Sequence, residues 1–249
     1  MIANYHTHTR WCRHGTGEIG DYAAYAARIG LGELAITEHV PLPGDPDGVR
    51  MRFAEFPAFD AELDRTIDEY RGKIRIRKGL ECEYFPYMLE TYKEHKKQYG
   101  YELLILGQHT NIARTLDNYC LYEPRQLSLY AEEVCEGLNT GLFDFLAHPD
   151  VVICGYEKVD APMLDAMGRI FATCKKLDIP VEINAGGIRH HRGYPSREIW
   201  RLARDYDLTC IVSADAHNVQ DLEGWSIKRC EDLAAELGLR LLDRLEECL

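Results

Sequence analysis

Residues 2–8 read Ile-Ala-Asn-Tyr-His-Thr-His and combine a short apolar run with two closely spaced histidines. The apolar part, Ile2–Tyr5, gives way at once to polar residues, which is typical of a buried strand in a parallel sheet. Because side chains alternate between the two faces of an extended chain, His6 and His8 would direct both imidazoles to the same side. The stretch therefore predicts a strand that ends in a pair of possible metal ligands.

The same pattern of a short apolar run followed by polar or turn residues returns along the chain, and stretches with helical spacing separate the runs. Alternating strands and helices are typical of a parallel sheet, so the order predicts an α/β fold, either a barrel or a doubly wound sheet. The expected strands are Ile2–Tyr5, Leu34–Ile36, Ile74–Leu80, Leu103–Leu106, Phe143–Ala147, Pro180–Ile183 and Cys210–Val212. The expected helices are Ile19–Ile29, Phe56–Tyr70, Pro124–Leu138, Ala161–Leu177 and Ser196–Tyr206.

The chain has 249 residues, of which 46% are hydrophobic and 28% are charged. This length and composition suit one globular domain over residues 1–249, with a core that needs no disulfides. The net charge of −12 argues against a nucleic-acid polymer or an anionic membrane as partner, since both attract basic surfaces. A small anionic substrate stays compatible with this charge, because bound metal ions reverse the local field.

Nine cysteines are scattered from Cys12 to Cys248 without a Cys-x-x-Cys pair, which favours reduced thiols over a disulfide framework. The first residues carry no basic region followed by an apolar run, and no apolar stretch approaches the ~20 residues of a membrane span. These features predict a cytoplasmic protein. The Pro- and Gly-rich stretch Pro41–Phe53 predicts a long loop that could close over a substrate, and Thr110–Tyr122 is a second candidate.

Residues with nitrogen or carboxylate donors cluster just after the expected strands. In parallel α/β folds the carboxyl ends of the strands meet on one face, where active sites are built. Such donors suit zinc, iron or manganese, and nine of them exceed what one four-coordinate ion needs. The sequence therefore predicts a site for two or three divalent metal ions. The nine candidates are His6, His8, His14, His39, Glu81, His109, His148, Asp215 and His217.

The sixth expected strand ends differently, in Val-Glu-Ile-Asn-Ala-Gly-Gly-Ile-Arg. It offers Asn184, a Gly-Gly turn that permits close backbone approach, and Arg189, which could hold a phosphate through two hydrogen bonds. A surface arginine after a flexible turn is the competing interpretation. His95, within Lys-Glu-His-Lys-Lys, is expected on a solvated helix face, and His190 and His191 stay ambiguous.

Taken together, these motifs resemble the PHP (polymerase and histidinol phosphatase) superfamily, and in particular its histidinol-phosphate phosphatase branch. The resemblance spans nearly the whole chain. It implies a distorted, TIM-like (β/α)7 barrel with a trinuclear metal site of zinc, manganese or iron at the carboxyl ends of the strands. The matching motifs are Tyr-His-Thr-His-Thr, Thr-Glu-His, Gly-Leu-Glu-Cys-Glu-Tyr, Leu-Gly-Gln-His, Ala-His-Pro-Asp, Glu-Ile-Asn and Asp-Ala-His.

The resemblance also implies how the ligands divide among three ions. The first ion takes His6, His8, Glu81 and Asp215, the second takes His109 and His148 with Glu81 as a bridge, and the third takes His14, His39 and His217. Arg189 falls where related phosphatases bind phosphate, and Arg50, in a Val-Arg-Met segment, is a second candidate.

The implied activity is hydrolysis of a small phosphate monoester, with L-histidinol phosphate of histidine biosynthesis as the expected substrate. A hydroxide bridging two metals that share Glu81 would attack phosphorus, since metal binding lowers the pKa of water to roughly 7. Asp215, His217 or a metal-bound water could protonate the leaving alkoxide, which makes Glu81, Asp215 and His217 the candidate catalytic residues.

Three alternatives remain open from the sequence. The first is another phosphoesterase of the superfamily, acting on nucleotides, other small phosphate esters or a nucleic-acid end. The second is a metal-binding module without catalysis. The third is an amidohydrolase, whose barrel also begins with His-x-His but usually depends on a lysine after the fourth strand, where this chain has Gly-Gln-His.

Overall fold

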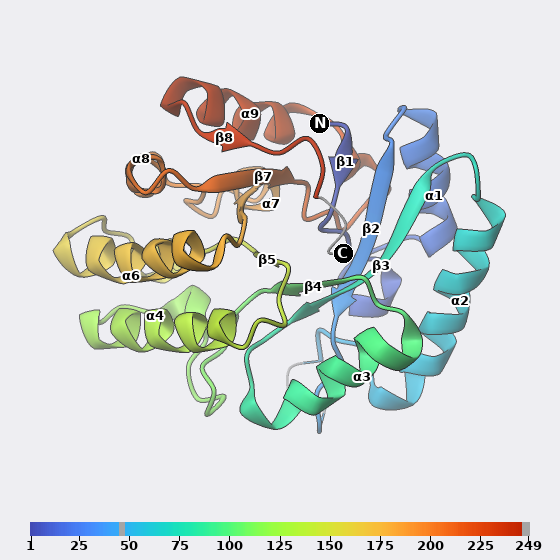
Figure 1. Cartoon of the computed structure of the whole chain (residues 1–249), viewed down its shortest axis with the longest axis horizontal. Coiled ribbons are helices and arrows are strands. Elements are labelled where there is room, and N and C mark those ends of the chain that lie inside the picture. The colour runs from blue at the N-terminus through green and yellow to red at the C-terminus, as the bar shows by residue number, and fades with distance from the viewer. Residues whose placement is uncertain (45–47, 246–249) are drawn as a thin grey trace.

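The computed structural model describes residues 1–44 and 48–245. In these ranges one sheet of eight parallel strands follows the chain order from β1 to β8. The sheet curls on itself and helices cover its outer face (Figure 1). The strands are β1 (Ala3–Asn4), β2 (Glu33–His39), β3 (Arg75–Cys82), β4 (Leu103–Leu106), β5 (Phe145–Leu146), β6 (Val181–Asn184), β7 (Thr209–Ser213) and β8 (Arg240–Leu241).

All seven expected strands are present within a few residues of their expected bounds. The eighth strand, β8, was not predicted, because its two residues are exposed and form no apolar run. The sheet closes where the chain leaves β1 and β7. There the N–H of His8 donates to the carbonyl of Ala216 at 2.8 Å, and the N–H of Ala216 donates to the carbonyl of His6 at 3.2 Å. The distorted TIM-like barrel is thus confirmed, with β8 as an addition beside β7.

In the described ranges all five helices named from the sequence are present, together with four further helices. Short 3-10 turns η1 (Arg10–Cys12), η2 (Phe53–Glu55), η3 (Pro86–Met88), η4 (Asn118–Cys120) and η5 (Val219–Leu222) lie in the connecting loops. The expected helices are α1 (Ile19–Arg28), α2 (Phe56–Glu69), α4 (Pro124–Asn139), α6 (Ala161–Leu177) and α8 (Arg197–Asp205). The additional helices are α3 (Leu89–Tyr99), α5 (Ile153–Tyr156), α7 (Ala185–Arg189) and α9 (Trp225–Leu237).

Capping signals explain why α6 has the bounds that its sequence predicts. Asp160 precedes the helix, and its side chain accepts a hydrogen bond from the N–H of Met163. Pro162 stands in the first turn, where a missing N–H costs nothing. The helix ends at Asp178, which has a left-handed backbone with φ of 55°.

The expectation for His95 was wrong. On α3 this side chain is only 5% exposed, and its ring packs 4.6 Å from the ring of Phe56 at the start of α2. Tyr101 completes the cluster, with ring centroids 5.6 Å from His95. The charged neighbours of His95 in sequence face water. The opposite side of α3 packs against the first residue of α2, Phe56, and His95 lies on that side.

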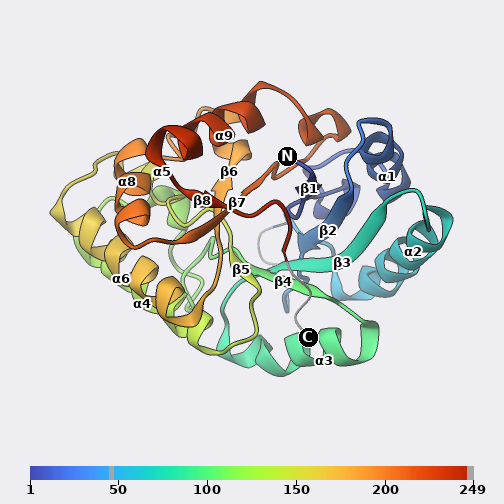
Figure 2. The same ribbon diagram turned by 45° about the horizontal axis from the view of Figure 1, so that its top comes forward.

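The interior of the barrel holds its own small apolar cluster, separate from the larger core between sheet and helices. Its members recur at every second residue, as in Leu103 and Ile105 of β4, because alternate side chains share a face. Leu245 adds to this cluster, and its N–H donates to the hydroxyl of Tyr5 at 2.9 Å. The last described residues therefore pack onto the barrel interior, and Figure 2 shows the chain after β8 passing beside β1.

The loop expected over Pro41–Phe53 is present up to Gly44 and again from Gly48, and its residues 45–47 lie outside the described ranges. Its proposed closure over a substrate therefore stays a prediction. In the described part of the chain, no helix has the length and apolar character needed to cross a bilayer.

Candidate metal centre

Glu81, near the end of β3, lies at the centre of the expected ligands and is 1% exposed. Its Oε1 lies 2.9 Å from Nε2 of His148 and 3.3 Å from Nε2 of His109. Its Oε2 lies 2.8 Å from Nδ1 of His39 and 3.3 Å from Nε2 of His8. His39 pairs with Glu81 in the parallel register of β2 and β3, so the sheet itself sets that contact. One carboxylate thus joins histidines from four different loops or strands.

The histidines of the opening His-x-His motif face each other beside this carboxylate. Nε2 of His6 lies 3.0 Å from Nε2 of His8. Asp215, just after β7, has its Oδ1 3.6 Å from each of these two nitrogens. Of the four groups predicted for the first ion, His6, His8 and Glu81 have ligand atoms close enough to share an ion, and Asp215 lies beside the two histidines.

A second pair of imidazoles shows most directly that the donors suit a cation. Nε2 of His14 lies 2.8 Å from Nε2 of His217. The Nδ1 atoms of both rings face backbone carbonyls, of Cys12 at 2.8 Å and of Asp215 at 3.2 Å. A carbonyl only accepts, so each neutral ring carries its proton on Nδ1 and a lone pair on Nε2. Two facing lone pairs repel, and a metal ion between them would satisfy both.

The third histidine predicted for that ion, His39, lies farther off. Its ring centroid is 5.5 Å from that of His14. Its ring stacks on His8 at 4.4 Å, and His8, His39 and His217 have ligand atoms close enough to share an ion. All nine predicted ligand side chains therefore converge on one site, although His39 lies beside His8 of the first predicted ion as well as beside His14 and His217 of the third.

Two of these residues have an unusual backbone. Asp215 has φ of 47° and His148 has φ of 26°, in the left-handed region that non-glycine residues rarely adopt. Such conformations cost on the order of 1–3 kcal/mol and persist where surrounding contacts enforce them, which is common at functional sites.

Three buried carboxylates that were not among the predicted residues lie beside Nδ1 atoms of the histidines, and of the three only Glu182 forms a hydrogen bond with its ring. Oε1 of Glu182 lies 2.8 Å from Nδ1 of His6. Oε1 of Glu83 lies 3.4 Å from Nδ1 of His109, and Oε2 of Glu38 lies 3.7 Å from Nδ1 of His8. A carboxylate behind a ligating histidine fixes its tautomer and raises its basicity. The available signal was their position, one or two residues from a ligand or at a strand end.

Two glycines leave room for the carboxylates of the centre. A Cβ at Gly107 would overlap Oε1 of Glu81 and stand 2.8 Å from its carboxyl carbon. A Cβ at Gly186 would lie 2.7 Å from Oδ2 of Asp215. Both distances are shorter than real Cβ contacts, so a larger residue at either position would displace a central carboxylate.

The imidazoles and carboxylates of the metal centre shift one another's pKa values. Burial raises the pKa of Glu81, but His109, His39 and the other imidazoles outweigh this and hold it well below its usual range. The same balance depresses the pKa of Asp215. Burial lowers the pKa of His8, yet Glu38 and Glu81 raise it overall to about 9. For His217, burial and the charge of His8 lower the pKa to about 3.

The residues expected to bind phosphate have protein partners instead. Arg50 is 2% exposed and its guanidinium pairs with Glu83, so its role as a phosphate ligand stays a prediction. Asn184 is buried and donates to Glu182 at 2.9 Å and to Asp215 at 3.2 Å. Arg189 donates to the carbonyls of Ala214 and Asp215, both at 2.8 Å. Phosphate binding by Asn184 and Arg189 likewise stays a prediction.

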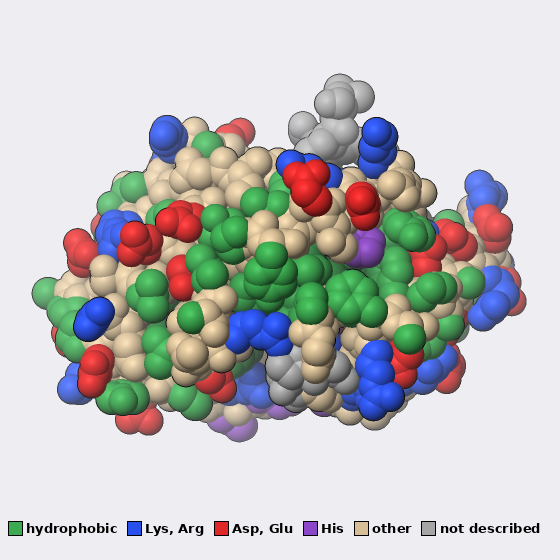
Figure 3. Space-filling view, turned by 90° about the horizontal axis from the view of Figure 1, so that it is seen from below, with side chains coloured by type: hydrophobic (Ala, Val, Ile, Leu, Met, Phe, Trp, Pro, Cys, Tyr) green, Lys and Arg blue, Asp and Glu red, His purple; other side chains and the backbone are tan. Residues whose placement is uncertain are grey.

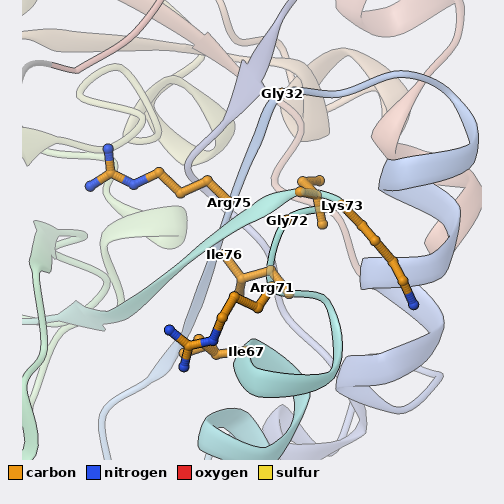
Figure 4. A pocket seen from close by; sticks show the side chains of 8 residues that line it. Gly32, Ile67, Arg71, Gly72, Lys73, Arg75 and Ile76 are labelled. Carbon is orange, nitrogen blue, oxygen red and sulfur yellow. The ribbon is translucent and has the colours of Figure 1, made fainter.

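A separate pocket lies at the amino-terminal end of β3, away from the centre, and Arg71, Lys73 and Arg75 help to line it (Figure 4). Their side chains point in different directions. Arg71 pairs with Asp68, Arg75 pairs with Glu102 at 3.2 Å, and Lys73 lies over the ring of Tyr70. The pocket therefore does not gather its positive charges on one point.

Known proteins that are similar to this chain identify its family. The PHP domain model matches residues 4–186, and the chain belongs to the PHP domain family. A Deinococcus radiodurans protein named "Probable histidinol-phosphatase" is 26% identical over 256 residues, covering 99% of this chain and 92% of that protein. The histidinol-phosphatase of Bacillus subtilis is 36% identical over 86 residues, which are 32% of each chain.

Among solved structures, the histidinol phosphate phosphatase of Lactococcus lactis, complexed with zinc, L-histidinol and phosphate, is similar with a TM-score of 0.75. The two chains are 17% identical, and the match covers 97% of this chain and 95% of that one. At this identity the likeness shows the fold, which agrees with the TIM-like barrel described above.

Proposed function

We propose that this protein is a metal-dependent phosphatase that hydrolyses L-histidinol phosphate to L-histidinol and phosphate. The observation that carries the proposal is the convergence of five histidines on the buried carboxylate of Glu81, with Asp215, His14 and His217 beside them. The named activities of the Deinococcus and Bacillus relatives support the substrate, as do the ligands of the Lactococcus structure.

The residues present fit a cluster of two or three divalent ions of zinc, manganese or iron. His6, His8, Glu81 and Asp215 would hold one ion, His109 and His148 would share Glu81 with it, and His14, His39 and His217 would hold a third. Bound divalent ions would supply Lewis acidity toward the phosphoryl group and make water a nucleophile at neutral pH.

The protein's own groups prepare this centre. Glu182 keeps a proton on Nδ1 of His6, which leaves Nε2 of that ring for an ion. Glu83 and Glu38 place negative charge 3.4 Å and 3.7 Å from Nδ1 of His109 and His8. The pKa of Asp215 is well below its usual range and that of His217 is about 3, so at neutral pH Asp215 is a carboxylate and His217 is a neutral ring. They are therefore better suited to bind cations than to protonate the leaving alkoxide.

Two alternatives lose support from the structure. An amidohydrolase would bridge its metals with a lysine, whereas Glu81 occupies the central position here. A nucleic-acid substrate would favour a continuous basic surface. On the face shown in Figure 3, Lys and Arg side chains lie among Asp and Glu around a hydrophobic area. A cytoplasmic location stays a prediction.

The test is a substrate screen on metal-free protein reconstituted separately with zinc, manganese and iron. L-Histidinol phosphate should give a kcat/KM at least tenfold above nucleoside monophosphates and sugar phosphates, and Glu81→Gln should abolish turnover. Glu236→Gln, an exposed carboxylate on α9 paired with Arg197, is the matched control and should behave as wild type. A strong preference for another ester would reassign the substrate, and no hydrolysis of any ester would overturn the proposal.

A further inference from the structure

We infer that Arg189 and Asp221 form a clamp that positions the segment Asp215–His217, and that Arg189 acts through this segment instead of binding phosphate. The segment carries two of the proposed metal ligands, so the inference rests on the proposed metal centre. The two clamp residues come from separate loops, after β6 and after β7, and they meet on the backbone between the ligands and α9.

Arg189, the last residue of α7, uses most of its guanidinium on this segment. Its Nη2 donates to the carbonyls of Ala214 and Asp215, both at 2.8 Å. Its Nη1 donates to Oγ of the buried Ser226 at 3.4 Å, and its Nε lies 3.2 Å from Oδ1 of Asp221. A guanidinium has five N–H donors, and these hydrogen bonds use three of them, including both on Nη2, while Nε meets Asp221 as an ion pair without a hydrogen bond. A two-bond grip on phosphate would therefore break at least one.

Asp221, in η5, holds the other side of the same turn. Its Oδ2 accepts hydrogen bonds from the N–H groups of His217 and Asn218, both at 3.0 Å. Its Oδ1 faces Nε of Arg189. The carboxylate of Asp221 thus contacts both the backbone N–H of His217 and the guanidinium of Arg189. Arg189 in turn binds the carbonyl of Asp215, so the turn is held on both sides.

The segment needs this support because of its backbone. Asp215 adopts φ of 47°, a conformation that costs free energy in any residue other than glycine. In that conformation its carbonyl points toward Arg189 and also accepts from Nδ1 of His217. The clamp therefore stabilises the backbone that aims Asp215 at His6 and His8 and that fixes the tautomer of His217.

The experiment compares Arg189→Gln and Asp221→Asn in the full-length protein, with Arg197→Gln and Asp232→Asn as controls. The control residues form exposed ion pairs, with Glu236 and Lys228. Metal content per chain and metal dissociation constants are measured without substrate, and kcat and KM are measured at saturating metal. The metal readout is independent of the substrate, so it stands even if L-histidinol phosphate proves to be the wrong ester.

If the clamp acts as inferred, both variants weaken binding of the most labile ion by about 10- to 100-fold, as loss of groups that orient ligands does elsewhere. Excess metal then restores activity with KM unchanged, and the double variant is no worse than the more severe single one. Arg189→Lys, which keeps the charge but not the geometry, should give an intermediate loss of metal.

A different pattern would overturn the inference. If Arg189→Gln raised KM for the phosphate ester and the inhibition constant of inorganic phosphate at full metal content, while Asp221→Asn behaved as wild type, Arg189 would be a phosphate ligand. If Arg189→Gln failed to fold, Asp221→Asn with wild-type metal affinity would be equally decisive against the clamp.

Discussion

Nδ1 of His6 lies 2.8 Å from Oε1 of Glu182, although 176 residues separate the two in the chain. The other oxygen of Glu182 accepts the backbone N–H of His148 and the side-chain amide of Asn184, both at 2.9 Å. A single buried carboxylate therefore orients one proposed ligand through its ring and another through its backbone. This arrangement extends the metal centre beyond the residues that face the ions.

Replacing Glu182 with Gln should weaken metal binding while the barrel stays folded. The amide is nearly isosteric, but it lacks the charge that holds the proton on Nδ1 of His6, and metal affinity should fall by about 10- to 100-fold. Titration of the metal-free protein with zinc measures the loss. Glu231→Gln, a partly exposed carboxylate that pairs with the N-terminus, serves as control. Unchanged zinc affinity would show that Glu182 does not set the ligand tautomer.

Two glycine substitutions should have different effects, one on the metal centre and the other on the stability of the fold. Gly107→Ala places a Cβ against the carboxylate of Glu81, which must move, so metal content and kcat/KM should drop at least tenfold. Gly20→Ala in α1 meets nothing within 4 Å and should raise the free energy of unfolding by about 0.5–1 kcal/mol. Denaturant unfolding and metal analysis of both variants test this. A fully loaded, active Gly107→Ala protein would contradict the described position of Glu81.

Metal binding should release protons near neutral pH. The pKa of His8 is raised to about 9, because Glu38 and Glu81 outweigh the effect of burial, so the ring is protonated at pH 7.5 before metal arrives. An ion can bind only the neutral ring, and the proton must leave. Calorimetric titration with zinc in two buffers of different ionisation enthalpy measures the release. Identical heats in both buffers would mean that no proton is displaced.

His95 should make stability depend on pH in the acidic range. Burial lowers its pKa to about 4, from an ordinary value of 6.5. The unfolded chain binds this proton below pH 6.5 and the folded chain does not until about pH 4, so stability falls as the pH drops through this window. The loss between pH 7.5 and pH 5 is at most about 2 kcal/mol.

The variant His95→Leu tests this dependence, because leucine cannot titrate and both ring nitrogens lack a hydrogen-bond partner among the described residues. Denaturant unfolding of wild type and variant at pH 5 and pH 7.5 gives the difference between their pH dependences. The variant should lose less stability on acidification. Equal losses in the two proteins would show that His95 titrates normally.

Much of the fold and of the centre could be predicted because the signals are local. A run such as Leu103–Leu106 identifies a buried strand by itself, and its observed bounds are the expected ones. A histidine that follows such a run must lie at the carboxyl end of the sheet, whatever the rest of the chain does. Errors arose where the deciding contact is distant. His95 has charged neighbours in sequence, but Phe56 covers it in space.

The sequence alone determined the type and position of the metal-binding side chains, since donor chemistry and strand period are properties of short segments. Only the tertiary structure decided which polar groups support them. The role of Glu182 depends on the closure of the barrel, which brings β6 and the loop after β7 against the end of β1. The pairing of β6 with β7 brings the guanidinium of Arg189 to the Asp215 backbone, because a side chain's partners depend on what folding places within its reach.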